Sequence, residues 1–346
     1  MSNPILVEVL RGMLVESRHT GAVAVVDAGG KSVLSLGDVG TPIYPRSAVK
    51  ALQALPLVES GAADLYGLGP EELALACASH SGESGHVATA TRMLSAAGLD
   101  PSALKCGAHW PIHQPSVQAL ARSGGIAGAV HNNCSGKHAG FLCVACATGA
   151  DRAHYTEPSH PVQRLVRHTI ESLTGVPLAQ DDCAIDGCSA PTWALPLVSL
   201  ARGFARFGTG VGLMTDRARA AARLRDACAA HPWHVAGTGR FCTQIMERFG
   251  ARIFMKTGAE GVYCGALPDQ GLGIAIKCDD GAGRAAEVMM AATLLRMARP
   301  ITDFGGLEPF ARVTLRNWNG IEVGGEGVAG AAARGKRCCR SLRPWP

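Results

Sequence analysis

The sequence predicts a chain of mixed helix and sheet, an α/β (α+β) fold with helices first and strands later. Apolar stretches with helical character occupy residues 71–78 and 87–97. Three short apolar segments at 253–257, 261–266 and 271–277 are separated by glycine turns, as strands are. The chain has 346 residues, 47% of them hydrophobic, which is enough to bury a large core. A folded rather than a disordered chain is therefore expected.

The other elements follow from the same patterns. Small polar residues at 79–86 separate the first two helices and are typical of a loop at a functional site. Apolar stretches at 139–147 and 190–200 each follow a polar segment that carries cysteines, so each is predicted to be a helix that begins beside thiols. A helix over 285–297 follows the strands, and no internal repeat interrupts the series.

The end of the chain differs in composition from the rest. Residues 324–336 are rich in glycine and alanine, with little capacity to pack. We therefore expect the folded part of the chain, as one large domain or two moderate ones, to end near residue 320, and a disordered, low-complexity tail over 321–346. The net charge is +5, and the tail holds five basic residues against two acidic ones. Without a basic stripe on the body of the chain, nucleic acid is not expected as a partner.

The first residues and the cysteines predict the compartment. Glu8, Arg11 and Glu16 interrupt the apolar N-terminal segment, and no stretch has the length of a membrane span. The thirteen cysteines are an odd number scattered over a long chain, which argues against a complete disulfide framework. We expect a soluble cytoplasmic protein with mostly reduced thiols and no membrane partner.

Ser47 and Lys50 form an S-x-x-K pair at a predicted helix start, just after Pro45. A spacing of three residues puts the hydroxyl and the amine on one helix face, where they could share a hydrogen bond. A lysine kept neutral by burial or by a neighbouring cation can take the proton of a serine, so the pair favours acyl-transfer hydrolysis. The alternative is a helix N-cap followed by a solvated lysine.

A second group of residues has the chemistry of a metal site. Cys134 and Cys188 would supply two thiolates to a tetrahedral Zn²⁺, and Lys137 lies one helical turn after Cys134. Lysine is an unusual ligand, and His131 and His138 are the more ordinary candidates. The alternative is that these cysteines are simply buried apolar residues.

Taken together, five blocks of sequence resemble the bacterial L-asparaginases of the rhizobial, thermolabile, asparaginase II-like type. The blocks are P-R-S-A-V-K at 45–50, C-A-S-H-S-G-E at 77–83, H-N-N-C-S-G-K-H at 131–138, D-G-C-S-A-P at 186–191 and M-K-T-G-A-E-G at 255–261. The resemblance covers residues 5–320 and implies a single catalytic domain over residues 1–320. It implies a fold like that of serine β-lactamases and glutaminases, with a mostly antiparallel sheet flanked by helices and a helical region. It also implies a homodimer that hydrolyses L-asparagine to L-aspartate and ammonia.

The resemblance implies two Ser-Lys tandems in the catalytic site, Ser47 with Lys50 and Ser79 with Lys256. In the mechanism that we predict, Ser47 attacks the side-chain amide after Lys50 removes its proton, and water hydrolyses the resulting aspartyl ester. Ser79 with Lys256 either relays protons or supplies the nucleophile itself, because either tandem meets the same chemical requirement.

The resemblance also implies a zinc site and a substrate site. The zinc ligands would be Cys134, Lys137 and Cys188. The substrate-binding residues would be Arg46, His80 and Asp186, each of which has a plainer interpretation: a surface ion pair, a loop histidine with its hydrogen bonds satisfied, and a turn former. Cys242 lies in the same neighbourhood, and Glu83 and Asn133 are looser candidates.

Other functions share part of this pattern. The K-T-G at 256–258 matches one motif of β-lactamases and penicillin-binding proteins, but no S-D-N accompanies it. A related amidase such as a glutaminase is the main alternative, and a non-catalytic zinc-binding protein of the same fold is the third. Turnover of an amide would separate the enzymes from the binding protein.

Overall fold

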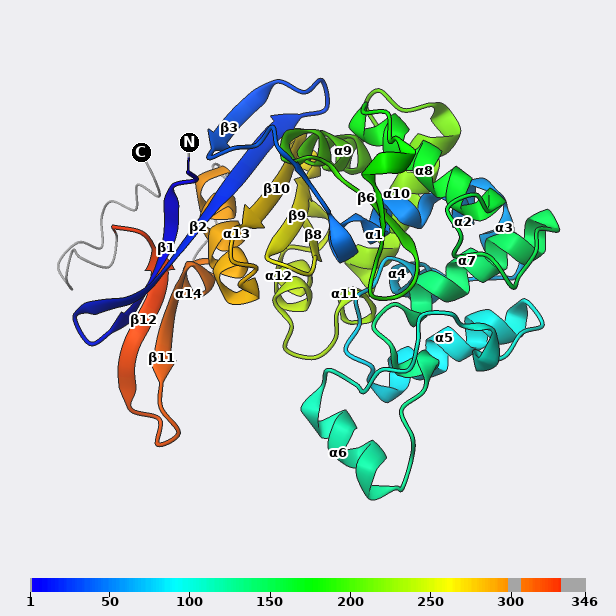
Figure 1. Cartoon of the computed structure of the whole chain (residues 1–346), viewed down its shortest axis with the longest axis horizontal. Helices are drawn as coiled ribbons and strands as arrows, with labels where there is room; N and C mark the ends of the chain where they lie inside the picture. The colour runs from blue at the N-terminus through cyan, green and yellow to red at the C-terminus, as the bar shows by residue number, and fades with distance from the viewer. Residues whose placement is uncertain (1, 298–305, 331–346) are drawn as a thin grey trace.

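The computed structural model describes residues 2–297 and 306–330, and it places an antiparallel sheet beside a helical region (Figure 1). Every neighbouring pair of strands in the main sheet is antiparallel. In order across the sheet, the strands are β11 (Arg312–Arg316), β12 (Glu322–Val328), β1 (Ile5–Arg11), β2 (Leu14–Asp27), β10 (Leu272–Cys278), β9 (Val262–Leu267) and β8 (Phe254–Thr257), while β3 (Ser32–Leu36) pairs with β2 off this path. The predicted combination of an antiparallel sheet with helices is confirmed.

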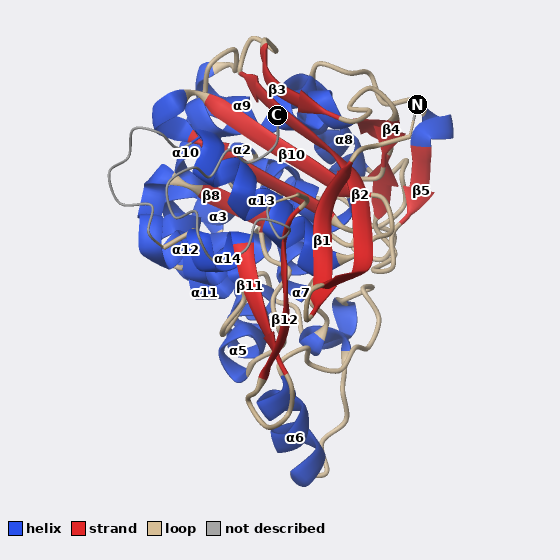
Figure 2. Cartoon of the chain, turned by 90° about the vertical axis from the view of Figure 1, so that its left-hand side faces the viewer, coloured by secondary structure: helices blue, strands red, loops and turns tan. Residues whose placement is uncertain are grey.

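The long strand β2 joins two parts of the sheet. Its first half pairs with β1, and its second half, which runs from Gly21 to Asp27, pairs with β10 (Figure 2). Residues 21–26 are buried without the alternation that a half-exposed strand would show. A strand that is buried on both faces needs helices on both faces.

Two helices cover the opposite faces of the sheet, α9 (Leu197–Thr209) and α13 (Gly283–Met297). A side chain at Gly273 would meet the backbone of α9 at 2.0 Å. The next residue of β10, Ile274, points to the other face. It is paired with Gly265 of β9, where a side chain would face Met290 of α13. Successive residues of a strand face opposite sides, so the two helices sandwich β9 and β10.

The helical region lies beyond β8, the strand at the end of the sheet (Figure 1). Its central helix, α7, is buried continuously from Ser135 to Ala145. Besides α9 and α13, the α-helices of the described chain are α1 (Lys50–Gln53), α2 (Leu55–Glu59), α3 (Ala62–Leu65), α4 (Pro70–Ala76), α5 (Ser84–Ala96), α6 (Gln114–Arg122), α7 (Ser135–Thr148), α8 (Pro161–Thr174), α10 (Thr215–Ala230), α11 (Pro232–Val235) and α12 (Phe241–Phe249), with α14 (Glu308–Ala311) before β11. The short 3-10 turn η1 (Arg46–Val49) leads into α1, and two small sheets pair β4 (Pro42–Ile43) with β7 (Leu195–Pro196) and β5 (Cys183–Ile185) with β6 (Pro191–Trp193).

Most predicted elements are confirmed, and one is wrong in part. The helices α4, α5, α7 and α13 and the strands β8, β9 and β10 lie where the sequence predicts them, within a few residues. The helix predicted over 190–200 is instead β6 and β7, and α9 begins only at Leu197. Thr192 and Trp193 favour a strand, and proline at 196 suits a helix start rather than a helix interior.

The boundary predicted at residue 320 falls inside a hairpin rather than at the end of the structure. The strand β12 lies beyond it and is inserted between β1 and β11. A Cβ on Gly324 would lie 1.8 Å from the carbonyl oxygen of Leu10. The glycines that suggested a tail are therefore what let the strand approach its neighbour. The rest of the predicted tail, 331–346, lies outside the described residues.

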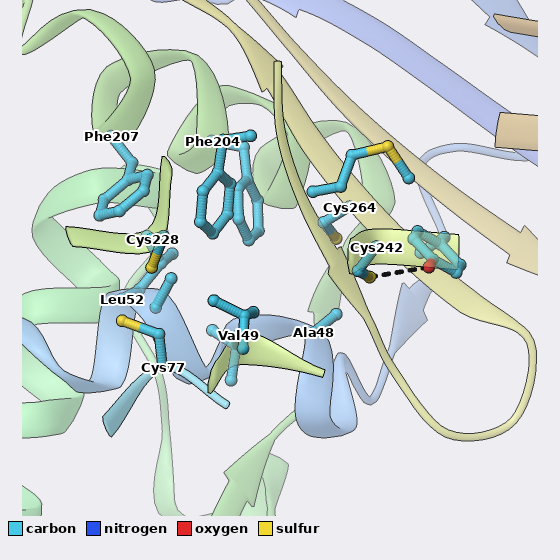
Figure 3. Close-up of a cluster of buried hydrophobic side chains, with 14 of the residues drawn as sticks. Ala48, Val49, Leu52, Cys77, Phe204, Phe207, Cys228, Cys242 and Cys264 are labelled. Atoms are coloured by element: carbon cyan, nitrogen blue, oxygen red, sulfur yellow. Dashed lines mark hydrogen bonds between the residues drawn. The ribbon is translucent and has the colours of Figure 1, made fainter. Parts of the chain in front are cut away.

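The core lies where the sheet meets the helical region. Phe204 and Phe207 of α9 pack their rings against Phe254 of β8, with centroids 6.1 and 5.1 Å apart. Figure 3 shows Phe204 and Phe207 near Leu52, Val49 and several thiols. The eleven cysteines in the described part of the chain are all free, and most are buried as small apolar residues. No helix within residues 2–297 or 306–330 has the length and apolar character needed to cross a membrane.

Candidate active site

The side chain of Ser79 lies between two buried lysines. Ser79 follows α4, Lys50 begins α1, and Lys256 stands on β8, so three distant segments meet at one hydroxyl. The Ser79 Oγ is 3.0 Å from Lys50 Nζ and 2.8 Å from Lys256 Nζ. Both lysines have no exposed surface, and Ser79 is 4% exposed. The structure therefore brings together three of the four predicted catalytic residues.

Carbonyl groups fix how the two amines are oriented. Lys50 Nζ donates to the carbonyl oxygens of Ala78, at 2.8 Å, and Asn133, at 3.2 Å. Lys256 Nζ donates to the carbonyl oxygen of Thr257 at 2.7 Å. A carbonyl oxygen can only accept, so each amine must keep its hydrogens on these contacts. When either amine is neutral, its lone pair is left for the Ser79 hydroxyl.

Burial adjusts the proton affinity of one of these amines. Burial, together with the positive charge of Lys50 beside it, lowers the pKa of Lys256 from 10.5 to about 7. An amine with such a pKa is partly neutral near neutral pH, where it can accept a proton from a hydroxyl. The pair formed by Lys256 and Ser79 thus has the chemistry of a general base and its serine.

Ser47 lies apart from this contact. It is half-buried, within the 3-10 turn η1, and it follows Arg46, whose φ of 50° lies in the left-handed region. A residue with a side chain rarely adopts that conformation, and such strain is common at functional sites. Within the described residues, no hydrogen bond joins Lys50 to the Ser47 hydroxyl. The lysine lies against Ser79 instead.

Arg46 and Asp186 form an ion pair at the edge of the site. Arg46 Nε donates to Asp186 Oδ1 at 2.8 Å, and both side chains are largely covered. Asp186 stands in the loop between β5 and β6, where Ser189 has a φ of 69°. The structure therefore brings two of the predicted substrate-binding residues together in a partly exposed ion pair.

His80 makes hydrogen bonds within the protein through both of its ring nitrogens. The backbone N–H of Gly82 donates to its Nδ1, so its Nε2 carries the proton and donates to Ser135 Oγ at 2.9 Å. The ring is fully buried, and burial holds the pKa of His80 well below its usual value. His80 joins the loop after α4 to the start of α7, and its contact with substrate stays a prediction.

The predicted zinc ligands come from the start of α7 and from the loop between β5 and β6. Lys137 Nζ lies 3.0 Å from Cys188 Sγ, and both are buried. A hydrogen bond with the Cys134 thiol lowers the pKa of Cys188, and the Lys137 charge lowers it further. Burial opposes the ammonium form of Lys137, but the Cys188 thiolate raises the pKa of this lysine above its usual value. The three predicted ligands therefore form one buried cluster.

This cluster fits a metal ion in its donor set. Two sulfur atoms and an amine nitrogen are soft to borderline ligands, which Zn²⁺ accepts. His138 lies beside them: its Nδ1 is 2.7 Å from the Tyr155 hydroxyl, and its hydrogen bond with Cys188 also lowers the pKa of that thiol. His131, the other candidate ligand, accepts a hydrogen bond from the backbone of Gly128.

Three features of this site were missed or only loosely predicted from the sequence. The carbonyl groups that orient Lys50 belong to Ala78 and Asn133, and backbone acceptors carry no sequence signal. The Glu83 carboxylate accepts from both the backbone and the hydroxyl of Thr238, which holds the loop before α12 against the site. Cys242, which the resemblance places in the same neighbourhood, has its sulfur 2.8 Å from the Tyr263 hydroxyl (dashed line in Figure 3).

Comparisons with solved structures found distant neighbours. A β-lactamase from Mycobacterium bovis is 13% identical, with a TM-score of 0.41, over 80% of this chain and 94% of that one. A protein described as Mglu is 13% identical, with a TM-score of 0.43, over 85% of this chain and 71% of that one. Its native form is 15% identical, with a TM-score of 0.42, over 91% of this chain and 73% of that one.

A comparison with curated proteins gave no match. The family model for L-asparaginase II matches residues 7–326, which is nearly the whole chain, and supports an amidohydrolase of the asparaginase type. The chain belongs to the L-asparaginase II family.

Proposed function

We propose that this chain is an L-asparaginase, which hydrolyses L-asparagine to L-aspartate and ammonia through a covalent serine ester. The observation that carries the proposal is the Ser79 hydroxyl held between the amines of Lys50 and Lys256. Membership in the L-asparaginase II family supports the same substrate class.

In the proposed mechanism, the buried trio of Ser79, Lys50 and Lys256 acts as the base. Neutral Lys256 takes the Ser79 proton, and Lys50 returns one to Ser79 across their 3.0 Å contact. Lys50 then exchanges this contact for one with Ser47, which lies one helical turn before it, and removes the Ser47 proton. The lysines later return a proton to the departing ammonia, and water hydrolyses the ester.

We assign the attack to Ser47 because it is the more accessible serine. Ser79 is almost fully buried, whereas Ser47 is half-buried and follows the left-handed Arg46. The backbone N–H of Ser47, at the start of η1, is a candidate donor to the oxyanion, and losing one such donor typically costs ~10²-fold in rate. Direct contact with both amines favours Ser79 as the second candidate for the attacking serine.

Single variants separate these two assignments. We expect Ser47→Ala to abolish turnover of L-asparagine and Ser79→Ala to lower kcat by orders of magnitude while both proteins stay folded. Full turnover by Ser47→Ala, with Ser79→Ala inactive, would move the attack to Ser79. No ammonia from L-asparagine with the wild-type chain would contradict the proposed activity, and release from L-glutamine alone would favour a glutaminase.

Arg46 and Asp186 suit the two charges of a free amino acid. Arg46 uses only Nε on Asp186, and its terminal nitrogens have no partner in the described residues, so they are available to an α-carboxylate. The Asp186 carboxylate is available to the α-ammonium group. We expect an amide that lacks the α-carboxylate to be a much poorer substrate, with most of the loss in KM.

The cluster of Cys134, Lys137 and Cys188 is proposed to hold Zn²⁺. When bound, the ion would fix the start of α7 to the loop that carries Asp186, and so would position the substrate rather than generate a nucleophile. Stringent chelation should therefore raise KM more than it lowers kcat. Loss of kcat alone, with binding and folding unchanged, would contradict this positioning role.

The homodimer and the cytoplasmic location rest on the family resemblance and on the sequence. Light scattering of the purified chain tests the first, and fractionation of cells that express it tests the second.

A further inference from the structure

A second group of metal-ligating side chains lies away from the active site, where β2, β10 and the start of α13 meet. His19 of β2, Cys278 at the end of β10 and Asp280 just before α13 have ligand atoms that all lie within 4.8 Å of one another. His19 Nδ1 is 2.6 Å from Asp280 Oδ2, and Cys278 Sγ donates to Asp280 Oδ1 at 3.0 Å. An imidazole, a thiol and a carboxylate therefore converge on one point.

The burial of this group is uneven in a way that suits a metal ion. His19 and Cys278 are buried, while the Asp280 side chain is 49% exposed. An ion held here would be reached from solvent on the carboxylate side and shielded on the other. Among the described residues, the His19 Nε2 atom is also buried with no hydrogen-bond partner.

The sheet register places a carboxyl group on the same face as this imidazole. Val7 is paired with His19 on one side and with Val328 on the other, and Glu326 lies two residues from Val328, so Glu326 shares the face. The Oε1 atom of Glu326 is buried without a hydrogen bond in the described part of the chain, and it forms an ion pair with Arg284 Nε at 3.8 Å. A proton that moved to His19 Nε2 would therefore have an acidic group on its side of the sheet.

We propose that His19, Cys278 and Asp280 form a metal site for Zn²⁺, distinct from the cluster at the start of α7. The ion replaces two hydrogens: the Cys278 thiol loses its proton to solvent, and the imidazole proton moves from Nδ1 to Nε2. Nitrogen, sulfur and oxygen donors suit Zn²⁺, and three protein ligands leave a fourth position for water on the exposed side.

The backbone links this site to the active site. The N–H of Cys278 donates to the carbonyl oxygen of Gly261 at 2.9 Å, and Lys277 Nζ donates to the carbonyl oxygen of Glu260. Gly261 ends the segment that follows Lys256 and β8. A metal on Cys278 would therefore stiffen the turn that follows the catalytic lysine.

The test is the zinc content of the full chain, measured by elemental analysis after dialysis against buffered zinc. Cys278→Ser and Asp280→Asn should each hold one equivalent less than wild type, or bind that equivalent about tenfold or more weakly. Cys188→Ser should lose a different equivalent, so the two clusters are counted separately. Cys143→Ser is the matched control, because Cys143 is a buried thiol of α7 that donates to a carbonyl group instead of a carboxylate.

Asp280→Asn keeps the size of an exposed side chain, so it should fold even if Cys278→Ser does not. A cobalt–thiolate absorption band that survives in Cys188→Ser and disappears in Asp280→Asn would support the proposal. Equal zinc content in wild type, Cys278→Ser and Asp280→Asn would overturn it, since the trio would then be only a hydrogen-bonded tie between β2, β10 and α13.

Discussion

Replacing Lys256 with methionine removes a buried amine while keeping the length of the side chain. Burial lowers the pKa of Lys256 from 10.5 to about 7, so between these values the unfolded chain binds more protons than the folded one. The contribution of Lys256 to the stability of the wild type must therefore rise with pH across this interval. A pKa shift of one unit corresponds to about 1.4 kcal/mol. At pH 7 and below, the buried amine therefore destabilises the folded state by on the order of 5 kcal/mol.

Lys256→Met lacks this destabilising amine. Its free energy of unfolding relative to wild type should therefore fall by up to about 1.4 kcal/mol per pH unit as the pH rises from 7 towards 10. The variant also loses the hydrogen bonds to Ser79 and Thr257. This loss changes the difference in free energy of unfolding by an amount that does not follow the same pH dependence. Urea unfolding of both proteins at several pH values measures the difference. Lys31→Met, on an exposed turn, controls for the loss of a positive charge.

A difference in free energy of unfolding that stays constant between pH 7 and 9.5 would refute the reasoning. It would mean that Lys256 keeps its proton in the folded chain, and that it cannot serve as a base near neutral pH.

Four further predictions concern activity and stability. The kcat/KM for L-asparagine should rise with pH through an apparent pKa near 7, because Lys256 must be neutral to accept a proton, and a pH–rate profile measures this. Arg46→Lys should raise KM about tenfold in steady-state kinetics, since an ammonium cannot hold Asp186 and a carboxylate in the same fork geometry. Phe204→Ala should cost about 3–5 kcal/mol in urea unfolding, because the ring is fully buried against two others. Gly324→Ala should lower the thermal midpoint by several degrees, since its Cβ would lie 1.8 Å from a carbonyl oxygen of β1.

The sequence predicted the elements with strong local signals. Apolar helices such as α4 and α7 and the glycine-bounded strands β8 to β10 are local patterns, and the structure has them where they are expected. The strands β1, β2 and β12 were missed, because their pairing joins the two ends of the chain. No local pattern shows that a glycine-rich segment fits between two strands.

The candidate site was predicted as a set of residues but not as a set of contacts. The S-x-x-K spacing suggested that Lys50 bonds to Ser47, and the fold instead turns that amine towards Ser79 and two carbonyl groups. Backbone acceptors from α4 and from the segment before α7 decide that orientation, and their positions depend on tertiary packing. The ion pair of Arg46 with Asp186 likewise joins residues 140 positions apart.

The account depends most on a covalent serine ester at this site. Rapid acid quenching during turnover of L-asparagine, followed by peptide mapping with mass spectrometry, locates the aspartyl group directly. We predict that it is found on Ser47 in the wild type and is absent from Ser47→Ala. Turnover with no acylated serine at any time point would contradict covalent catalysis, and an ester on Ser79 would show that the serine between the two lysines is itself the nucleophile.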